Sequence, residues 1–122
     1  MAAKNANLTH DQRDLLPLTP AVFFILFALA DGEKHGYAIM QQVGVLSGDK
    51  VRMGPGTLYT TIQRLLGLAL IEETATRDER DERRRYYRLT RAGKAVLQAE
   101  IGRMDAVLRI AQQKRLAPGH AQ

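Results

Sequence analysis

Arginine side chains gather in one short stretch of the sequence, TRDERDERRR. From residue 77 to residue 88 there are six arginines against four acids, and the stretch ends on Arg83, Arg84 and Arg85. A guanidinium group can bind a phosphate through two parallel hydrogen bonds. Three consecutive arginines therefore favour contact with the phosphates or the minor groove of a nucleic acid. The alternative is a solvated hairpin of mixed charge.

A second group of polar side chains lies on one face of a predicted helix that starts at Pro55. Leu58, Ile62 and Leu65 recur at spacings of four and three and form its apolar stripe. The opposite face carries one cation and no acid, which suits a surface that lies among phosphates; an ordinary polar surface helix is the alternative. The polar face consists of Thr57, Tyr59, Thr60, Thr61, Gln63 and Arg64.

The longest side chains of this face, Gln63 and Arg64, have the reach for bidentate contacts to base edges. We place Tyr59 against the DNA backbone and the threonines among the groove-facing side chains. Arg64 also has a structural alternative, which is an ion pair with an acid such as Glu72.

The elements that must position these side chains are a helix and the hairpin that follows it. Pro55 suits the first helical position, where its missing N–H costs nothing, and Gly67 can adopt the left-handed conformation that ends a helix. Strand-length runs at residues 70–76 and 84–89 flank the arginines, and alternation in the second run predicts one buried face. This is the outline of a winged helix-turn-helix, with the helix in the major groove and the hairpin as the wing.

The segments before this helix predict a small helical core. Residues 20–30 are apolar on nearly every side, so other elements must cover this helix all round, and Thr19 is its predicted cap. A further helix at residues 37–46 follows Gly36, and the open N–H groups at its start would suit a phosphate.

Polar residues fill the connections. Lys50 and Arg52 lie in the turn before Pro55, where a cation can reach the DNA backbone. Residues 9–16 predict a short helix with a capping-box spacing, and residues 1–7 are expected to be disordered.

The last segment, residues 91–116, predicts one long helix that Thr90 caps. Its apolar side chains follow a 4-3-4-3 spacing, as in a two-stranded seam. A helix of about 25 residues spans about 38 Å, more than a domain of this size covers. We therefore expect a second copy of the chain to cover it, and folding back onto its own domain is the alternative. The predicted dimer-interface side chains are Leu15, Leu16, Phe23, Phe27, Leu97, Ile101, Met104, Leu108 and Ala111.

Composition argues against several classes of function. The chain has 122 residues, a net charge of +5 and a pI near 9.9, which favour a polyanionic partner. It has no cysteine, and His10, His35 and His120 are scattered, so no catalytic set, metal site or cofactor is expected. The apolar run near residue 25 is about half the length of a membrane span and follows no basic cluster. A cytoplasmic protein without a membrane partner is therefore predicted.

Four motifs, HGYAIMQQV, GPGTLYTTIQRL, LALIEE and RRRYYRLTRAGK, resemble in order and spacing the PadR family of bacterial transcriptional regulators. The resemblance covers about residues 19–116. It implies a mainly helical winged-helix fold with a small β-wing and, as in the short subfamily, a single C-terminal dimerisation helix. It further implies a homodimeric repressor that binds double-stranded DNA. In such a dimer the N-terminal segment packs on the partner's last helix. It also adds Tyr37, a family-typical residue, to the DNA-binding set.

The chain departs from the family pattern at three places. Thr60 stands where proline is usual. Residues 66–69 replace a typical acidic turn that ends in glycine, which raises the question of what covers Leu66 and Leu68. The chain has no tryptophan, whereas short drug-binding members of the family can use one at the dimer interface.

The predicted function is therefore a DNA-binding transcriptional regulator, with a module that docks protein or RNA as the alternative, since the fold serves both uses. The predicted division is an N-terminal arm (1–18), a winged-helix domain (19–90), a dimerisation helix (91–116) and a tail (117–122). The apolar lining of the dimer interface allows two arrangements. Either a small apolar effector binds there and changes the spacing of the two winged-helix domains, here called heads, or the interface is a closed seam without a ligand.

Overall fold

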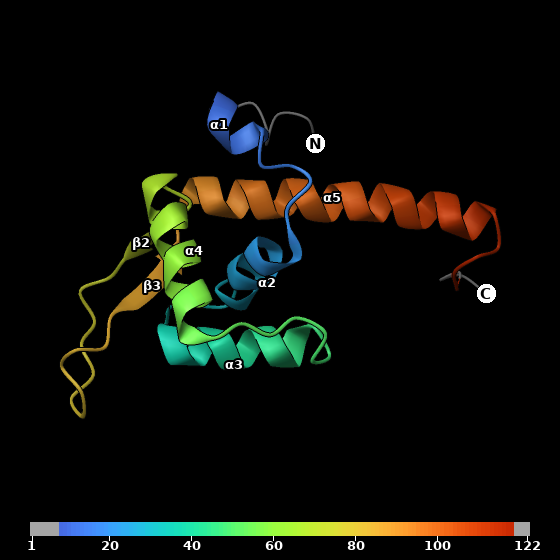
Figure 1. Ribbon diagram of the computed structural model, residues 1–122. Helices are drawn as coiled ribbons and strands as arrows, with labels where there is room; N and C mark the ends of the chain where they lie inside the picture. The colour runs from blue at the N-terminus through green and yellow to red at the C-terminus, as the bar shows by residue number, and fades with distance from the viewer. Residues whose placement is uncertain (1–7, 119–122) are drawn as a thin grey trace.

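The computed structural model describes residues 8–118, which form five helices and three short strands (Figure 1). In chain order these are α1 (His10–Arg13), α2 (Pro20–Ala28), β1 (Lys34–His35), α3 (Gly36–Leu46), α4 (Pro55–Gly67), β2 (Ile71–Glu73), β3 (Tyr86–Leu89) and α5 (Arg91–Gln113). Among residues 8–118 no helix is long and apolar enough to cross a membrane. The predictions for residues 1–7, for His120 and for the end of the tail lie outside the described residues.

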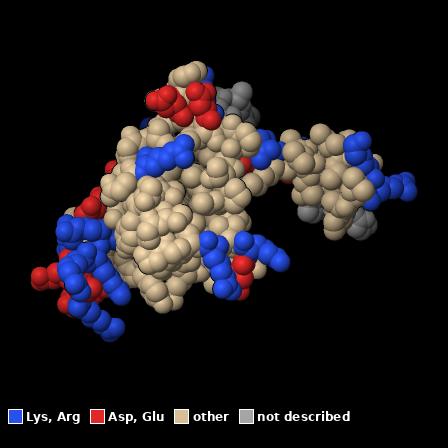
Figure 2. Space-filling model, viewed as in Figure 1, with Lys and Arg blue, Asp and Glu red and all other residues tan. Residues whose placement is uncertain are grey.

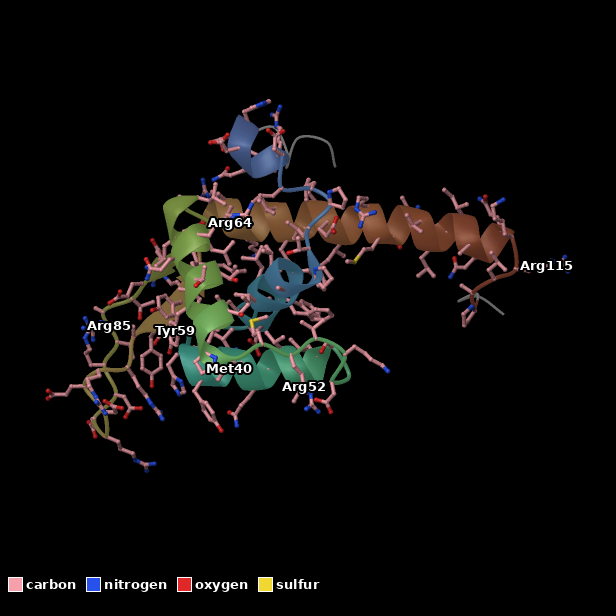
Figure 3. All side chains as sticks on the ribbon, viewed as in Figure 1. Met40, Arg52, Tyr59, Arg64, Arg85 and Arg115 are labelled. Atoms are coloured by element: carbon pink, nitrogen blue, oxygen red, sulfur yellow. The ribbon has the colours of Figure 1, made fainter. Side chains whose placement is uncertain are left out.

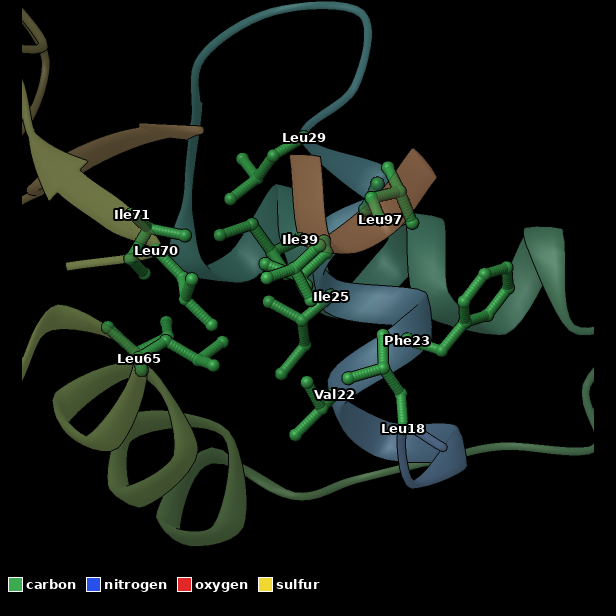
Figure 4. Packing of buried hydrophobic residues seen from close by; sticks show 14 of the residues in the cluster. Leu18, Val22, Phe23, Ile25, Leu29, Ile39, Leu65, Leu70, Ile71 and Leu97 are labelled. Carbon is green, nitrogen blue, oxygen red and sulfur yellow. The ribbon is translucent and has the colours of Figure 1, made fainter. Parts of the chain in front are cut away.

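Helix α2 lies at the centre of the structure, between α3 and α5 (Figures 1 and 4). Thr19 caps its N-terminus, as predicted. Ile25 and Leu26 are fully buried, as expected of a helix that other elements cover on nearly every side. The helix ends at Ala28, two residues earlier than predicted, and Phe27 remains 37% exposed.

The three strands form one antiparallel sheet in the order β1-β3-β2. Tyr87 of the central strand pairs with Lys34 of β1 on one side and with Glu73 of β2 on the other. The Tyr87 side chain is buried and Arg88 is exposed, which confirms the predicted alternation. β1 was not predicted. Both hairpin strands are shorter than the predicted runs, because the arginine-rich stretch between them leaves the sheet (Figure 1).

Helix α4 has the predicted start and a fully buried apolar stripe, but the left-handed residue after it is not the predicted one. The left-handed residue is Ala69, with a φ of 58°, and not Gly67. The Ala69 N–H donates to the Leu66 carbonyl at 3.0 Å. The Leu70 N–H donates to the Leu65 carbonyl at 3.0 Å, and both of these leucine side chains are fully buried. Burial of Leu65 and Leu70 favours a Schellman motif whose left-handed residue is Ala69, two residues after Gly67.

Helix α1 packs at the end of α4. Thr9 and Gln12 form the predicted capping box, and the Gln12 side-chain amide donates to the Leu68 carbonyl at 2.9 Å. Leu66 and Leu68 are half-buried against the core. The chain's own arm and core therefore cover the leucines that depart from the family pattern.

Helix α5 has two different halves. Its cap is Thr90, whose Oγ1 accepts a hydrogen bond from the Gly93 N–H at 3.0 Å. The first half packs against α2 and β3, and Leu97 is buried. From residue 101 to residue 110 every side chain is exposed, and this half projects beyond the rest of the chain (Figure 1). The helix ends at Gln113, three residues before the predicted end.

A buried carboxylate ties α5 to the arm. Glu100 is 1% exposed, and its Oε2 accepts a hydrogen bond from the Leu18 N–H at 3.0 Å. Its Oε1 accepts a second one from Arg103 Nε at 2.6 Å. The burial of Glu100 was not predicted, because helical periodicity carries no information about a partner on a distant segment.

Candidate nucleic-acid interface

A cleft of about 440 Å³ opens between the start of α3, the first half of α4 and the wing, which comprises residues 74–85. Figure 3 shows Arg85 on the wing and Tyr59 on α4 at this cleft. Five of its residues were predicted as DNA contacts, namely two tyrosines and the three consecutive arginines, so the fold brings together side chains from three separate segments. The lining residues are His35, Gly36, Tyr37, Tyr59, Asp81, Arg83, Arg84, Arg85 and Tyr87.

Gly36 and Tyr59 form the wall of the cleft where α3 meets α4. The three atoms nearest to a Cβ built at Gly36 all belong to the Tyr59 side chain, and the hydroxyl oxygen would overlap it. Glycine at this position therefore lets the Tyr59 ring lie across the start of α3. The ring remains 45% exposed, and it lines the cleft.

His35 caps the start of α3, a role that the sequence analysis missed. Its Nδ1 accepts a hydrogen bond from the Ala38 N–H at 3.2 Å, so this N–H is not open to a phosphate, contrary to the expectation for the helix after Gly36. Its Nε2 lies 3.2 Å from Arg84 Nη1, and its ring meets the Tyr86 ring edge-on at 5.3 Å. Burial lowers the pKa of His35 and the positive charge of Arg84 lowers it further, so the ring is neutral at neutral pH.

Each of the three arginines in the cleft is paired with a carboxylate of its own hairpin. The pairs are Arg83–Asp81 at 3.2 Å, Arg84–Asp78 at 3.0 Å and Arg85–Glu73 at 3.4 Å. Figure 2 shows basic and acidic side chains intermingled over this hairpin. The arginine side chains are 41% exposed or more, so a ligand can reach every one of them.

The polar face of α4 is exposed, as predicted. Thr61 is half-buried, and its Oγ1 donates to the Thr57 carbonyl at 2.8 Å, so this hydroxyl is engaged within the helix. No acid lies on α4, which leaves its surface free of charges that would repel phosphate. The exposed members of the face are Thr57, Tyr59, Thr60, Gln63 and Arg64.

Arg64 lies apart from the other predicted contacts. Figure 3 shows it at the α1 end of α4, away from the wing. It lines a hollow together with Asp11 and Asp14 of the arm. The alternative of an ion pair between Arg64 and Glu72 is not formed, because Glu72 Oε2 accepts a hydrogen bond from Arg88 Nε at 2.7 Å.

Two further cations lie in the loop between α3 and α4. Lys50 and Arg52 are exposed, and Arg52 is 3.9 Å from Asp49. A turn at the end of α3 holds this loop, in which the Asp49 N–H donates to the Gly44 carbonyl at 2.8 Å. Both cations remain predictions for contact with the DNA backbone.

The predicted dimer-interface residues fall into three groups. On the surface, Phe27, Ile101, Met104 and Leu108 are between 37% and 41% exposed. Half-buried positions are Leu15, Leu16 and Ala111. Phe23 and Leu97 are buried within the chain itself, so only a small part of either can meet a partner.

A helix with an acid-free polar face, a small antiparallel sheet and a cationic wing define a winged-helix DNA-binding protein. The sequence pattern of the transcriptional regulator PadR-like family matches residues 25–99, which is more than half of the chain. The chain therefore belongs to the PadR-like family of transcriptional regulators. Family membership confirms the predicted winged-helix fold and the predicted function as a transcriptional regulator. The members of this family are regulators and not enzymes, in agreement with the prediction that the chain is not an enzyme.

Two curated relatives each match about 60–66% of the chain. It is 45% identical over 75 residues to the transcriptional regulator Rv3488 of Mycobacterium tuberculosis, a match that covers 60% of this chain and 64% of that protein. It is 40% identical over 80 residues to an uncharacterized 37.1 kDa protein in transposon TN4556 of Streptomyces fradiae, with 66% of this chain and 21% of that protein covered. The chain thus spans about a fifth of the transposon protein and less than two thirds of the mycobacterial regulator.

Solved structures share the fold. A PadR family transcription regulator from Clostridium difficile R20291 matches with a TM-score of 0.64 and 24% identity, covering 78% of this chain and 97% of that one. Bacillus subtilis PadR, crystallised in complex with operator DNA, matches with a TM-score of 0.61 and 24% identity, covering 70% and 47%. At these identities the likeness supports the fold alone.

Proposed function

We propose that this regulator is a homodimeric repressor that binds double-stranded DNA, with the polar face of α4 in the major groove and the wing on the neighbouring backbone. In this proposal residues 19–90 form the DNA-binding domain and residues 91–116 the dimerisation helix. The observation that carries the proposal is the cleft, where three exposed arginines and two tyrosines meet beside α4. Such a combination suits phosphate contacts, which position a protein on DNA while other side chains read the bases.

Dimerisation rests on the projecting half of α5. Ile101, Met104 and Leu108 are exposed there at the predicted spacing, and Val107 and Ile110 widen the stripe. A contiguous apolar surface of this kind marks an interaction site. A second copy presents the same stripe, so a two-fold arrangement buries both at once.

The salt dependence of binding to a random-sequence DNA duplex tests the wing. Arg84→Ala and Arg85→Ala should each lower the magnitude of the log–log salt slope by about 0.9, the value for one lost phosphate contact. Arg115→Ala is the matched control, because it removes the same charge just beyond the far end of α5, away from the wing (Figure 3). If both wing variants keep the wild-type slope, the wing does not contact DNA.

Repression itself needs a target site. Footprinting on the DNA upstream of the chain's own gene would locate one, and a reporter placed behind that site gives the direction of regulation. Reduced expression in the presence of the protein supports a repressor, whereas increased expression would make the protein an activator.

The effector proposal concerns the same apolar stripe. An apolar ligand held between the α5 helices and Phe27 would favour a dimer whose heads are wrongly spaced for DNA, whereas a closed seam would hold no ligand. Titration with the apolar fluorescent probe anilinonaphthalene sulfonate separates the two arrangements. Saturable binding that releases DNA supports an effector site, and a dimer that binds no probe supports the closed seam.

A further inference from the structure

The cationic wing of this protein is neutralised by its own carboxylates. Every arginine of the cleft has one acid within 3.4 Å or less. These three acids are Asp78, Asp81 and Glu73, and the three arginine–carboxylate pairs carry no net charge, although the sequence RRR is strongly basic. Glu73 also lies 3.8 Å from Arg77. A phosphate that enters the cleft therefore meets arginines that already have an anionic partner.

These ion pairs compete with a phosphate without blocking it. Exposed ion pairs are weak, and a guanidinium has five N–H donors, so a carboxylate at one edge leaves other donors available. The carboxylate nevertheless cancels the positive charge and repels an incoming phosphate at short range. This repulsion is strongest at Asp81, because Asp81 itself lines the cleft.

Two of the competing carboxylates, Asp78 and Asp81, have a lowered pKa and keep their charge at neutral pH. The backbone N–H of Arg80 lowers the pKa of Asp78, and the backbone N–H of Arg83 lowers the pKa of Asp81. The neighbouring guanidinium groups lower both further. Neutralisation of the wing is therefore a property of the folded hairpin under ordinary conditions.

We propose that Asp81 and Glu73 are specificity-determining residues, which act as internal competitors of DNA phosphate and keep the affinity for DNA of any sequence low. The inference rests on the proposed function, since it requires the wing to contact DNA. Binding without sequence preference comes almost entirely from phosphate contacts. When the phosphate contacts contribute less, stable binding depends on the base contacts of α4, which these carboxylates do not oppose. The many other sites in the genome then compete less with the specific site for the protein.

Charge-neutralising substitutions separate this competition from a general effect of net charge. Asp81→Asn and Glu73→Gln keep a hydrogen-bond acceptor, and the acidic side chains are 34% and 40% exposed, so the fold tolerates both changes. Glu79→Gln is the matched control: it makes the same change in charge on the same hairpin, but Glu79 has no ion pair within the described part of the chain. Asp78 is less suitable, because it is 14% exposed and also accepts a hydrogen bond from the Tyr86 hydroxyl.

Fluorescence anisotropy with a random-sequence duplex measures the outcome. Asp81→Asn and Glu73→Gln should bind on the order of five- to ten-fold more tightly than wild type at about 0.1 M salt, with a salt slope steeper by about 0.9, as for one additional phosphate contact. Glu79→Gln should gain less than about two-fold, because it releases no arginine and its charge is screened. Circular dichroism confirms that each variant is folded.

Two failures are distinguishable. If the wild-type protein binds the duplex but neither Asp81→Asn nor Glu73→Gln exceeds the gain of Glu79→Gln, internal competition is overturned and the proposed function stands. If the wild-type protein does not bind duplex DNA even at low salt, the proposed function fails and the inference fails with it.

Discussion

Replacing Gly36 with alanine tests whether this glycine serves to seat Tyr59. The added Cβ would overlap the Tyr59 hydroxyl and ring, while the φ of Gly36 lies outside the left-handed region, so the backbone itself tolerates alanine. Overpacking of this kind costs about 1–3 kcal/mol. We expect the low end of this range, because the obstructing atoms lie at the tip of a side chain that is 45% exposed and can swing outward.

The same substitution in a Tyr59→Ala background provides the decisive comparison. Without the ring, Gly36→Ala should be neutral or stabilise the protein by about 0.4–1 kcal/mol, since alanine restricts the unfolded chain more than glycine does. The effect therefore disappears or changes sign, and the coupling free energy between the two sites is about 1–2 kcal/mol. Urea denaturation of wild type, both single variants and the double variant measures it. An equal cost of Gly36→Ala in both backgrounds would refute the packing argument.

Displacement of the Tyr59 ring should also weaken DNA binding, because the hydroxyl leaves its place at the edge of the cleft. Gly36→Ala should thus lower the affinity for duplex DNA in a protein that circular dichroism shows to be folded. An unchanged affinity would mean that Tyr59 does not contact the DNA backbone.

Three further substitutions test other parts of the molecule. Leu108→Lys places a charge in the exposed stripe of α5 and should yield monomers with a folded head and no DNA binding; a variant that remains dimeric by light scattering would rule out this seam. Gln63→Ala would remove the proposed bidentate base contact, worth about 1–3 kcal/mol, and should relax the preference at one or two base pairs; if selection from a random library returns the wild-type preference, Gln63 does not read bases. The hydrogen bond from Arg103 holds the pKa of Glu100 below its usual value of 4.5, so its contribution to stability is complete above that pH and is lost as the pH falls through the lowered pKa. The difference in the free energy of unfolding between wild type and Glu100→Gln should therefore shrink on acidification, and a difference that is independent of pH would contradict this account.

The starts of four helices were predictable because their signals are local. Thr9, Thr19 and Thr90 accept hydrogen bonds from N–H groups three residues ahead, and Pro55 occupies a first helical position. Each signal involves residues within one turn of helix, so the sequence alone contains it. The buried stripe of α4 was predictable for the same reason, since its spacing follows from helix geometry.

Features that depend on distant partners were not predictable. β1 has two residues and exists through its pairing with β3, and Glu100 is buried because the Leu18 N–H needs an acceptor. The left-handed residue after α4 is Ala69 and not Gly67, because Leu70 is drawn into the core.

The candidate site shows the same division. Its side-chain types could be identified from the sequence, but the pairing of each arginine with one particular acid could not. Five arginines and four acids within one loop allow many pairings, and only the folded hairpin selects Arg84 with Asp78.

The head and the first half of α5 behave as one body, because direct contacts join them. A Cβ at Gly93 would overlap the Leu70 carbonyl oxygen, so α5 lies directly on the backbone that follows α4. Thr90 Oγ1 donates to the Ala69 carbonyl at 2.6 Å, and Glu100 fastens the arm to the same helix. The head therefore cannot turn independently of α5. In the proposed dimer the two α4 helices must lie about 34–36 Å apart to enter successive major grooves, and this separation is set where the projecting halves of α5 pack together. In this proposed dimer, a ligand or substitution at the seam would move a whole winged-helix domain, so we expect a change far from the wing to alter DNA binding.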